Sequence, residues 1–426
     1  QACFVSYRLN DLHHLREGLD GNPGGNRAIY LSKFYLKNDE YRLGKGLGVV
    51  DIAHNWMIPE VVQEKFEFID EIARTYDLDG IELDFLRSPN FFQTERHTKT
   101  PPTMAQRVQV MTQFISKVRK SIDESAKDGR RRWLCVRVPA EQADWIKVGL
   151  DPKAWRAAGV DMFNLSQSYN TSEQSDVALV RKLVPDATLY MELTQCAHRW
   201  KIDVNRKKLS ENFRRSGFLV LENAARTAYA RGADGVSYFN FVYYRGGHGS
   251  DPDHSGPAAE PPFAQLSALA SPKTLTAPPY YYWAGDDRYA GWEQRITEED
   301  AAPFAFTMDT VAPPRADMVM RMHLVFDGER MLREAYEGDD STERGKIDVI
   351  INGKKLVQIP NEKQWKEFPF KTDFEGGLGW DYQYLAWKVP YGILKDGKNE
   401  VSVRLRKGSA LWIRWVEIFN PKDIEK

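Results

Sequence analysis

The sequence predicts an α/β fold, a (β/α)8 TIM barrel over residues 1–275, followed by an all-β sandwich over residues 276–426. Up to about residue 275, short apolar runs alternate with longer helical patterns, which is typical of repeated βα units. A Pro- and Tyr-rich segment at 273–283 then changes the pattern, and only strand-like runs and turn signals follow it. At 426 residues, 42% of them hydrophobic, the chain can bury one large core and one smaller core.

The strands expected in the first part are apolar runs of five to seven residues: 3–7, 48–53, 80–85, 133–138, 162–166, 188–193 and 235–241. Helical spacing of apolar residues predicts helices at 60–76, 104–125, 175–182, 216–231 and 263–269. Seven strands are one fewer than a (β/α)8 barrel needs, so we expect its first strand upstream of Gln1, unless a segment that we do not recognise as a strand fills its place. The alternative is an open doubly wound sheet, which would normally show a Gly-rich first turn.

The second part has strand-like runs at 316–326, 346–351, 385–389, 400–405 and 411–419, separated by Asp-Gly and Asn-Gly turns. This is the pattern of an antiparallel sandwich. Four tryptophans of this part could stack on a glycan or pack against the barrel: Trp380, Trp387, Trp412 and Trp415.

Charge and composition exclude several classes of partner. With 59 basic and 60 acidic residues the net charge is -1, and we expect no nucleic acid partner. No apolar run is long enough to span a bilayer, so we expect no membrane segment. The three cysteines lack metal-ligand spacing, and we expect no metal and no cofactor. An extracellular or periplasmic location is expected if a signal peptide precedes Gln1.

Carboxylates stand at the ends of the predicted barrel strands, where barrels place their active sites. Glu82 and Asp84 share one face of the strand at 80–85, because strand side chains alternate. Glu141 follows the strand at 133–138, and Glu192 lies in the strand at 188–193. Glycoside hydrolysis needs two such carboxyl groups, one to protonate the leaving oxygen and one to attack carbon or activate water. For Glu82 alone, we favour a structural salt bridge with an arginine.

The run Asp79-Gly80-Ile81-Glu82-Leu83-Asp84-Phe85 resembles the fourth-strand signature of several barrel glycosidase groups. Its similarity to the α-amylase-like signature implies that Asp84 is the nucleophile, Glu141 the general acid and Glu192 a third carboxylate. This sequence has Glu82 where those barrels have Arg. The chitinase-like signature is also similar through Asp84, but its catalytic Glu falls on Leu86.

A closer resemblance, over roughly the first 275 residues, is to bacterial glycosyl-hydrolase-like barrel proteins of polysaccharide-degrading bacteria. The motifs that carry it are Ser6-Tyr7-Arg8-Leu9-Asn10-Asp11-Leu12-His13-His14 and residues 79–89. Endo-fucanases look like relatives, since they are similar in placing an Asp and a later Glu at matching strand ends. This resemblance implies a hydrolase of glycosidic bonds in polysaccharides.

Other polar residues are expected to surround the same mouth and bind substrate: Arg8, Asn10, His13, His14, His54, Glu82, Arg87, Arg137, Asn164, Gln167, Asn240, Tyr243 and Arg245. The arginines among them match the oxygens of sulfate or carboxylate groups, which would favour an anionic polysaccharide. Alternatively, they neutralise Glu82, Glu141 and Glu192.

The sequence therefore predicts a glycoside hydrolase that cleaves a complex polysaccharide, with sulfated or otherwise anionic chains among the candidates. We expect a retaining mechanism with Asp84 as nucleophile and Glu141 as acid/base, because neighbouring strands lie only about 4.8 Å apart. Glu192 would orient substrate or tune the other two carboxyl groups. Asp84→Asn should abolish turnover and leave folding and glycan binding nearly intact. The alternatives are a non-catalytic carbohydrate-binding barrel and a polysaccharide lyase that uses Tyr or His as base.

Overall fold

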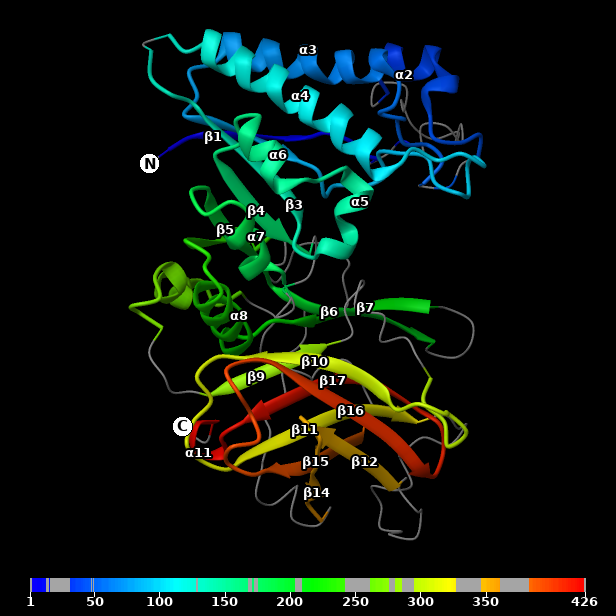
Figure 1. The fold of residues 1–426 in the computed structure, drawn as a ribbon, viewed down its shortest axis with the longest axis vertical. Coiled ribbons are helices and arrows are strands. Elements are labelled where there is room, and N and C mark those ends of the chain that lie inside the picture. Colours follow the sequence, from blue (N-terminus) through cyan, green and yellow to red (C-terminus); the bar gives the residue numbers. More distant parts are fainter. Residues whose placement is uncertain are drawn as a thin grey trace. The chain divides into compact units, whose positions relative to one another are not determined.

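The chain forms two compact units in a computed structural model (Figure 1). The structure describes residues 2–12, 15, 31–46, 48, 50–127, 129–167, 171, 175–203, 209–241, 261–275, 280–285, 295–326, 346–360 and 383–424. Unit 1 comprises Gln1–Ser168, Asp176–Met191 and Gly232–Asp234. Unit 2 comprises Tyr169–Ser175, Glu192–Arg231 and Gly235–Lys426. The predicted domain boundary at residues 275 and 276 stays a prediction.

A six-stranded sheet has the order β1-β2-β3-β4-β5-β8. Its strands are β1 (Phe4–Arg8), β2 (Gly80–Asp84), β3 (Trp133–Pro139), β4 (Met162–Ser166), β5 (Thr188–Thr194) and β8 (Gly235–Phe239). The pairs from β1 to β5 are parallel, as predicted for βα units. A doubly wound sheet reverses its strand order at a switch point, and among the described strands the order never reverses. Right-handed crossovers then place the connecting helices on one face of the sheet.

The predicted strand at 48–53 was wrong. In the structure β1 lies directly beside β2, with Phe4 opposite Gly80. The described residues of this segment form turns in which Gly44 N–H donates to the carbonyl oxygen of Asp51. Glycines line this turn because a Cβ on Gly46 or Gly48 would lie 2.6 or 2.8 Å from Asp51 Oδ2. Ile52 and Ala53 of this run are buried without belonging to a sheet.

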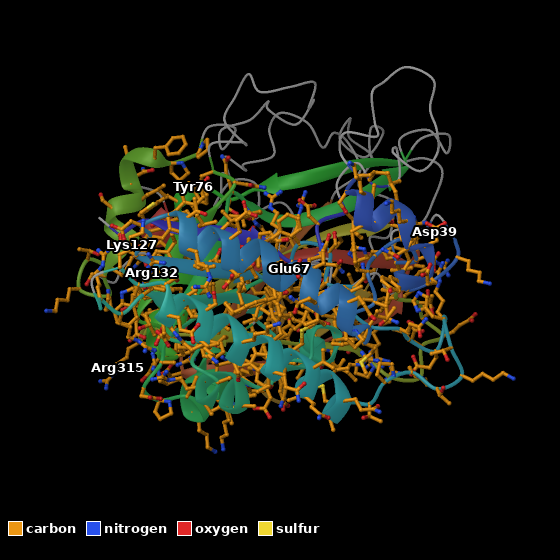
Figure 2. All side chains as sticks on the ribbon, turned by 90° about the horizontal axis from the view of Figure 1, so that it is seen from above. Asp39, Glu67, Tyr76, Lys127, Arg132 and Arg315 are labelled. Carbon is orange, nitrogen blue, oxygen red and sulfur yellow. The ribbon has the colours of Figure 1, made fainter. Side chains whose placement is uncertain are left out.

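The two long predicted helices are confirmed as α3 (Pro59–Thr75) and α4 (Met104–Glu124). Figure 2 looks onto them, with Glu67 on the outer side of α3, while Val61 and Ile69 of the same helix are buried. A capping box between Thr103 and Gln106 begins α4. The other helices within the described residues are α2 (Lys33–Lys37), η2 (Asp39–Tyr41), η3 (Gln142–Asp144), α5 (Trp145–Val148), α6 (Pro152–Ala157), α7 (Val177–Leu183), α8 (Phe218–Ala230), η5 (Phe263–Ala270) and α11 (Pro421–Ile424).

One hydrogen-bond pattern occurs three times at the amino-terminal edge of the sheet. An aspartate directly before a strand donates its N–H to the carbonyl of a residue at the start of the neighbouring strand, and its carboxylate accepts that residue's N–H. The pairs are Asp79 with Cys3, Asp161 with Leu134, and Asp234 with Leu189. These strand-start aspartates join the strands two by two, as β1 with β2, β3 with β4, and β5 with β8.

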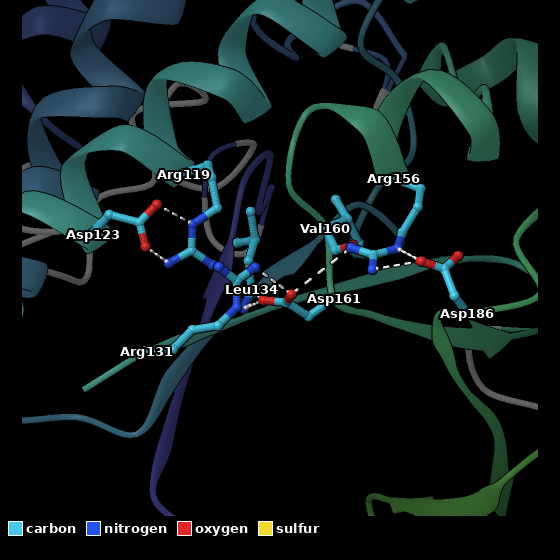
Figure 3. Close-up of polar contacts among 8 residues, drawn as sticks. All are labelled: Arg119, Asp123, Arg131, Leu134, Arg156, Val160, Asp161 and Asp186. Carbon is cyan, nitrogen blue, oxygen red and sulfur yellow. Dashed lines mark hydrogen bonds and ion pairs between the residues drawn. The ribbon is translucent and has the colours of Figure 1, made fainter. Parts of the chain in front are cut away.

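Each strand-start aspartate also binds arginine, and Asp161 binds most (Figure 3). Its carboxylate accepts from Arg119 at 3.1 Å and from Arg131 at 2.5 Å, and Arg156 lies 3.9 Å away. Arg119 is also paired with Asp123, and Arg156 with Asp186. The side chain of Asp161 is 6% exposed, so this buried charge is compensated from the ends of several elements.

Unit 2 contains two antiparallel sheets around one apolar core. One has the order β10-β16-β12-β13 and the other β14-β15-β11-β17-β9. Their strands are β9 (Tyr281–Gly285), β10 (Phe304–Thr310), β11 (Met318–Phe326), β12 (Lys346–Ile351), β13 (Lys354–Lys355), β14 (Val357–Gln358), β15 (Gln383–Val389), β16 (Gly397–Lys407) and β17 (Leu411–Phe419). The five strands predicted for this part are all present. Unit 2 also has a hairpin that we did not predict, of β6 (Cys196–Asp203) and β7 (Leu209–Arg215).

Two of the four sandwich tryptophans are buried, so packing rather than glycan stacking is their role. Trp387 lies in the core between the sheets. Trp415 stacks on Trp283, with ring centroids 4.6 Å apart, in a cluster that includes Val220 of α8. Trp412 is partly buried, and Trp380 lies outside the described residues.

No helix in the described ranges combines the length and the apolar character needed to span a bilayer.

Candidate active site

One face of β1, β2 and β3 carries polar side chains in two rows. The register places Ser6, Glu82 and Cys135 beside one another in the lower row. Two residues further on, at the carboxyl-terminal ends of the strands, it places Arg8, Asp84 and Arg137 in the upper row. The alternating residues of the opposite face are apolar and buried: Ile81, Leu83, Leu134 and Val136. The polar face is the candidate active site.

Asp84 is held by three donors that all reach the same carboxylate oxygen. Arg137 Nη1 donates to Asp84 Oδ1 at 2.9 Å, and both side chains are buried. The backbone N–H groups of Leu86 and Arg87 donate to the same oxygen at 2.8 and 3.2 Å, because the chain turns directly after β2. The hydrogen bonds therefore fix the orientation of the Asp84 carboxylate.

Neutral donors contact Glu82, and the expected Glu82–arginine salt bridge is not found among the residues that the structure describes. Ser6 Oγ donates to Oε1 at 2.7 Å. Asn164 Nδ2 donates to Oε2 at 3.3 Å, and Cys135 Sγ lies 3.6 Å from the same atom. Arg137 pairs with Asp84 instead, because the register of β2 and β3 places it opposite Asp84.

Glu141 follows β3 by two residues and is partly exposed. Gln167 Nε2 donates to Glu141 Oε1, so this predicted substrate-binding amide binds the predicted general acid. The backbone beside it is tied to the end of β4, where Ala140 N–H donates to the carbonyl of Ser166. Ser166 Oγ also accepts from Arg137 Nη2 at 3.2 Å. Arg137 thus links the Asp84 carboxylate to the strand end beside Glu141.

A second group of charges follows β1. Arg8 Nη1 donates to Asp11 Oδ2 at 3.1 Å, and Arg87 Nε lies 3.8 Å from Asp11 Oδ1. The Arg8 side chain is 44% exposed, whereas that of Arg87 is 14% exposed. Burial lowers the pKa of Arg87, and the charge of Asp11 opposes that shift. We did not predict Asp11 as a site residue, although its spacing of three from Arg8 could have indicated the pair.

His54 packs in an aromatic cluster, its ring centroid 5.1 Å from that of Tyr35 and 5.7 Å from that of Phe34. Burial lowers its pKa to about 3, and the charges of Lys65 and Arg42 add to the shift. Its Nε2 has no hydrogen-bond partner within the part of the chain that the structure describes. His54 is therefore a neutral, packed side chain at pH 7.

Three other predicted site residues lie in or after three different strands, β1, β5 and β8. Asn10 is buried and donates to the carbonyl of Asn90 at 2.6 Å, which joins the loops after β1 and β2. Glu192 is a buried residue of β5 that belongs to unit 2, whereas Asp84 and Glu141 belong to unit 1. Asn240 follows β8 with a φ of 59°, a left-handed conformation that Asn tolerates. The remaining four lie outside the described residues: His13, His14, Tyr243 and Arg245.

The chemistry of the described site is that of carboxyl groups and arginines. Within the described ranges, His, Cys, Asp and Glu side chains form no group of three or more that could hold a metal ion. Asp84 and Glu141 stand at the ends of neighbouring strands, one oriented by an ion pair and the other partly exposed.

No protein-family model and no curated protein matches the sequence. Solved structures that resemble it include a cycloisomaltooligosaccharide glucanotransferase from Paenibacillus sp., at 10% identity and a TM-score of 0.29, covering 97% of this chain and 45% of that one. An α-galactosidase from Geobacillus stearothermophilus has 10% identity and a TM-score of 0.28, with 84% and 43% covered. A β-porphyranase of glycoside hydrolase family 86 from the human gut bacterium Bacteroides plebeius has 11% identity and a TM-score of 0.23, with 80% and 78% covered. This chain spans less than half the length of the first two, and the endo-fucanase likeness stays a prediction.

Proposed function

We propose that this chain is a glycoside hydrolase that cleaves a polysaccharide with Asp84 as nucleophile and Glu141 as general acid/base. The observation that carries the proposal is the Asp84 carboxylate, oriented by three donors to Oδ1 at the carboxyl-terminal end of β2. Because those bonds all use Oδ1, the attack on the anomeric carbon is assigned to Oδ2. Glu141, at the end of the neighbouring strand, protonates the leaving oxygen and then deprotonates water.

The proposed stereochemical outcome is retention. Asp84 lies opposite Arg137 on two paired parallel strands, and such strands are about 4.8 Å apart. Glu141 lies four residues beyond Arg137, in the loop that leaves the same strand. Carboxyl groups about 5–5.5 Å apart support a covalent intermediate, whereas inversion needs room for a water between them. The first product anomer, followed by NMR, tests this assignment.

The proposed substrate carries sulfate or carboxylate groups. Arg8 supports this proposal, since its exposed guanidinium stands at the end of β1 and its Cα pairs with that of Asp84. Arg87 adds a second guanidinium near Asp11. Planar guanidinium groups match the oxygens of both anions. A panel that includes sulfated polysaccharides and their desulfated forms tests the substrate class, and faster cleavage of the neutral forms would contradict it.

Asp84→Asn tests the function itself. We expect turnover to fall on the order of 10⁴-fold, the scale of losing one member of a catalytic unit. New reducing ends measure hydrolysis, and ultraviolet absorbance of an unsaturated sugar would reveal a lyase instead. Glycan binding that persists without any turnover in the wild type would favour the carbohydrate-binding alternative. Wild-type activity in Asp84→Asn would place the nucleophile elsewhere.

Asp84→Asn also needs a stability control, because it breaks a buried ion pair with Arg137. Asp161→Asn supplies it, since Asp161 is another buried, arginine-paired aspartate, at the other end of the strands. We expect both variants to be less stable than the wild type and only Asp84→Asn to lose activity per folded molecule.

The eight-stranded barrel is our proposal for the complete sheet. It is supported by parallel strands that follow one another without a reversal of order. An experimental structure with strands paired on the outer sides of β1 and β8 would test it.

A further inference from the structure

The backbone on both sides of Glu141 is held by one residue, Asp176. Its N–H donates to the carbonyl oxygen of Ala140 at 2.8 Å. Its Oδ2 accepts the N–H of Gln142, also at 2.8 Å. Ala140 and Gln142 are the two neighbours of Glu141, so Asp176 fixes the loop on each side of the carboxyl group that the proposed reaction uses.

Asp176 makes this contact instead of the one that its position favours. It is the N-cap of α7, where an aspartate normally accepts an N–H from the first turn of its own helix. No side-chain cap hydrogen bond is present on α7. Asp151, the N-cap of the neighbouring α6, does make that bond, to the N–H of Ala154 at 3.0 Å. The Asp176 carboxylate thus serves the Glu141 loop rather than its helix.

The Glu141 side chain is held as well as its backbone. Gln167 Nε2 donates to Oε1, and the Ala140 N–H donates to Ser166 of β4. We propose that Asp176 is a positioning residue that sets Glu141 for proton transfer to the leaving oxygen. This inference rests on the proposed function, in which Glu141 is the general acid/base.

The kinetic test compares Asp176→Ala with Asp176→Asn. Alanine removes the acceptor for Gln142 N–H but keeps the backbone bond to Ala140, whereas asparagine keeps an acceptor oxygen. With oligosaccharides as substrates, we expect kcat/KM to fall about 10–100-fold in Asp176→Ala and to recover in Asp176→Asn, because a displaced acid protonates the leaving oxygen poorly. With a dinitrophenyl glycoside of the same sugar, whose leaving group needs no proton, we expect little loss of kcat/KM, because kcat/KM reports the glycosylation step and not the later attack of water.

Asp151→Ala is the matched control, since it removes a capping aspartate that does not touch the Glu141 loop. It should leave both substrates unaffected. Equal losses of kcat/KM on the two substrates in Asp176→Ala, or no loss on either, would overturn the positioning role.

A second measurement separates this inference from the proposed function. In the full chain labelled with ¹³C at the glutamate carboxyl, the Glu141 signal is assigned by its disappearance in Glu141→Gln. We expect Asp176→Ala, but not Asp176→Asn, to move that signal and its pH titration. An unmoved signal would overturn the positioning role. A moved signal together with wild-type hydrolysis by Glu141→Gln would refute the general acid assignment and leave the positioning intact.

Discussion

At the scale of single residues, the buried imidazole of His54 makes stability depend on pH. Its pKa of about 3 in the folded chain lies below its ordinary value of 6.5, because burial disfavours the charged ring. As pH falls below about 6.5, the unfolded state binds a proton that the folded state excludes. The stabilising contribution is therefore complete above about pH 6.5 and is lost as the pH falls towards 3.

We expect the free energy of unfolding to drop between pH 7.5 and pH 5 by about 2 kcal/mol more in the wild type than in His54→Gln. This difference corresponds to one proton that the unfolded state binds and the folded state does not, over roughly one and a half pH units. Urea unfolding at the two pH values measures both chains. The same pH dependence in both would show that His54 is protonated in the folded state.

Strand-end position alone predicted Asp84 and Glu141 as site residues, because a carboxylate at the end of a barrel-like strand is rarely needed for packing. Their partners could not be predicted. The contacts of Glu141 with Gln167 and of Asp176 with Gln142 join residues 26 and 34 positions apart, and they depend on how loops return to the sheet. The spacing of residues in the sequence does not show which loops fold back onto the sheet at these positions.

At the scale of elements, the strand-start aspartates should differ in their effect on stability. Their side chains are 6% exposed in Asp161, 28% in Asp79 and 51% in Asp234. Water screens exposed ion pairs, whereas removing one partner of a buried pair costs about 3–5 kcal/mol. We expect the loss on substitution by Asn to follow the order Asp161, Asp79, Asp234, as measured by chemical unfolding. A loss for Asp234→Asn equal to that for Asp161→Asn would contradict this account.

Elements with a strong repeat could be predicted from the sequence, and those without one could not. The helical spacing over α3 and α4 gave their positions to within two residues. The run at 48–53 is apolar, but its neighbouring glycines allow the chain to turn about Asp51. Apolar character predicted burial there correctly, as Ile52 and Ala53 show, and predicted the strand wrongly.

At the scale of the whole molecule, helix α8 belongs to unit 2 and packs on the sandwich. Trp283 Nε1 donates to the carbonyl of Val220 at 3.3 Å. Arg231, which ends the helix, donates to Asp309 at 3.0 and 2.5 Å and to Asp396 at 3.1 Å. These two aspartates raise the pKa of Arg231, Asp309 most strongly. A cut at residue 275 would therefore expose the sandwich-facing side of α8.

We expect Arg231→Ala to lower the free energy of unfolding by about 1.5–3 kcal/mol, the scale of hydrogen bonds to charged groups. Asp396→Ala is the control, because Asp396 is 61% exposed and its pair with Arg231 should contribute less than about 1 kcal/mol. Tryptophan fluorescence during unfolding measures the stability of both variants, since the stacked Trp283 and Trp415 pack with Val220 of α8. Equal losses of unfolding free energy in the two variants would show that the pairing of Arg231 with Asp309 adds no stability to that of its pairing with Asp396.

The strand-start aspartates also bear on the order in which the sheet forms. Their bonds close loops of different length, since the sequence separation is 27 for Leu134 and Asp161, 45 for Leu189 and Asp234, and 76 for Cys3 and Asp79. Chain entropy makes the longest of these closures about 0.9 kcal/mol less favourable than the shortest. The β3–β4 pair is thus the first that a folding chain can join at low entropic cost. Arg137 and Ser166 lie on that pair, so a folding nucleus there would assemble part of the support of Asp84 before β2 arrives.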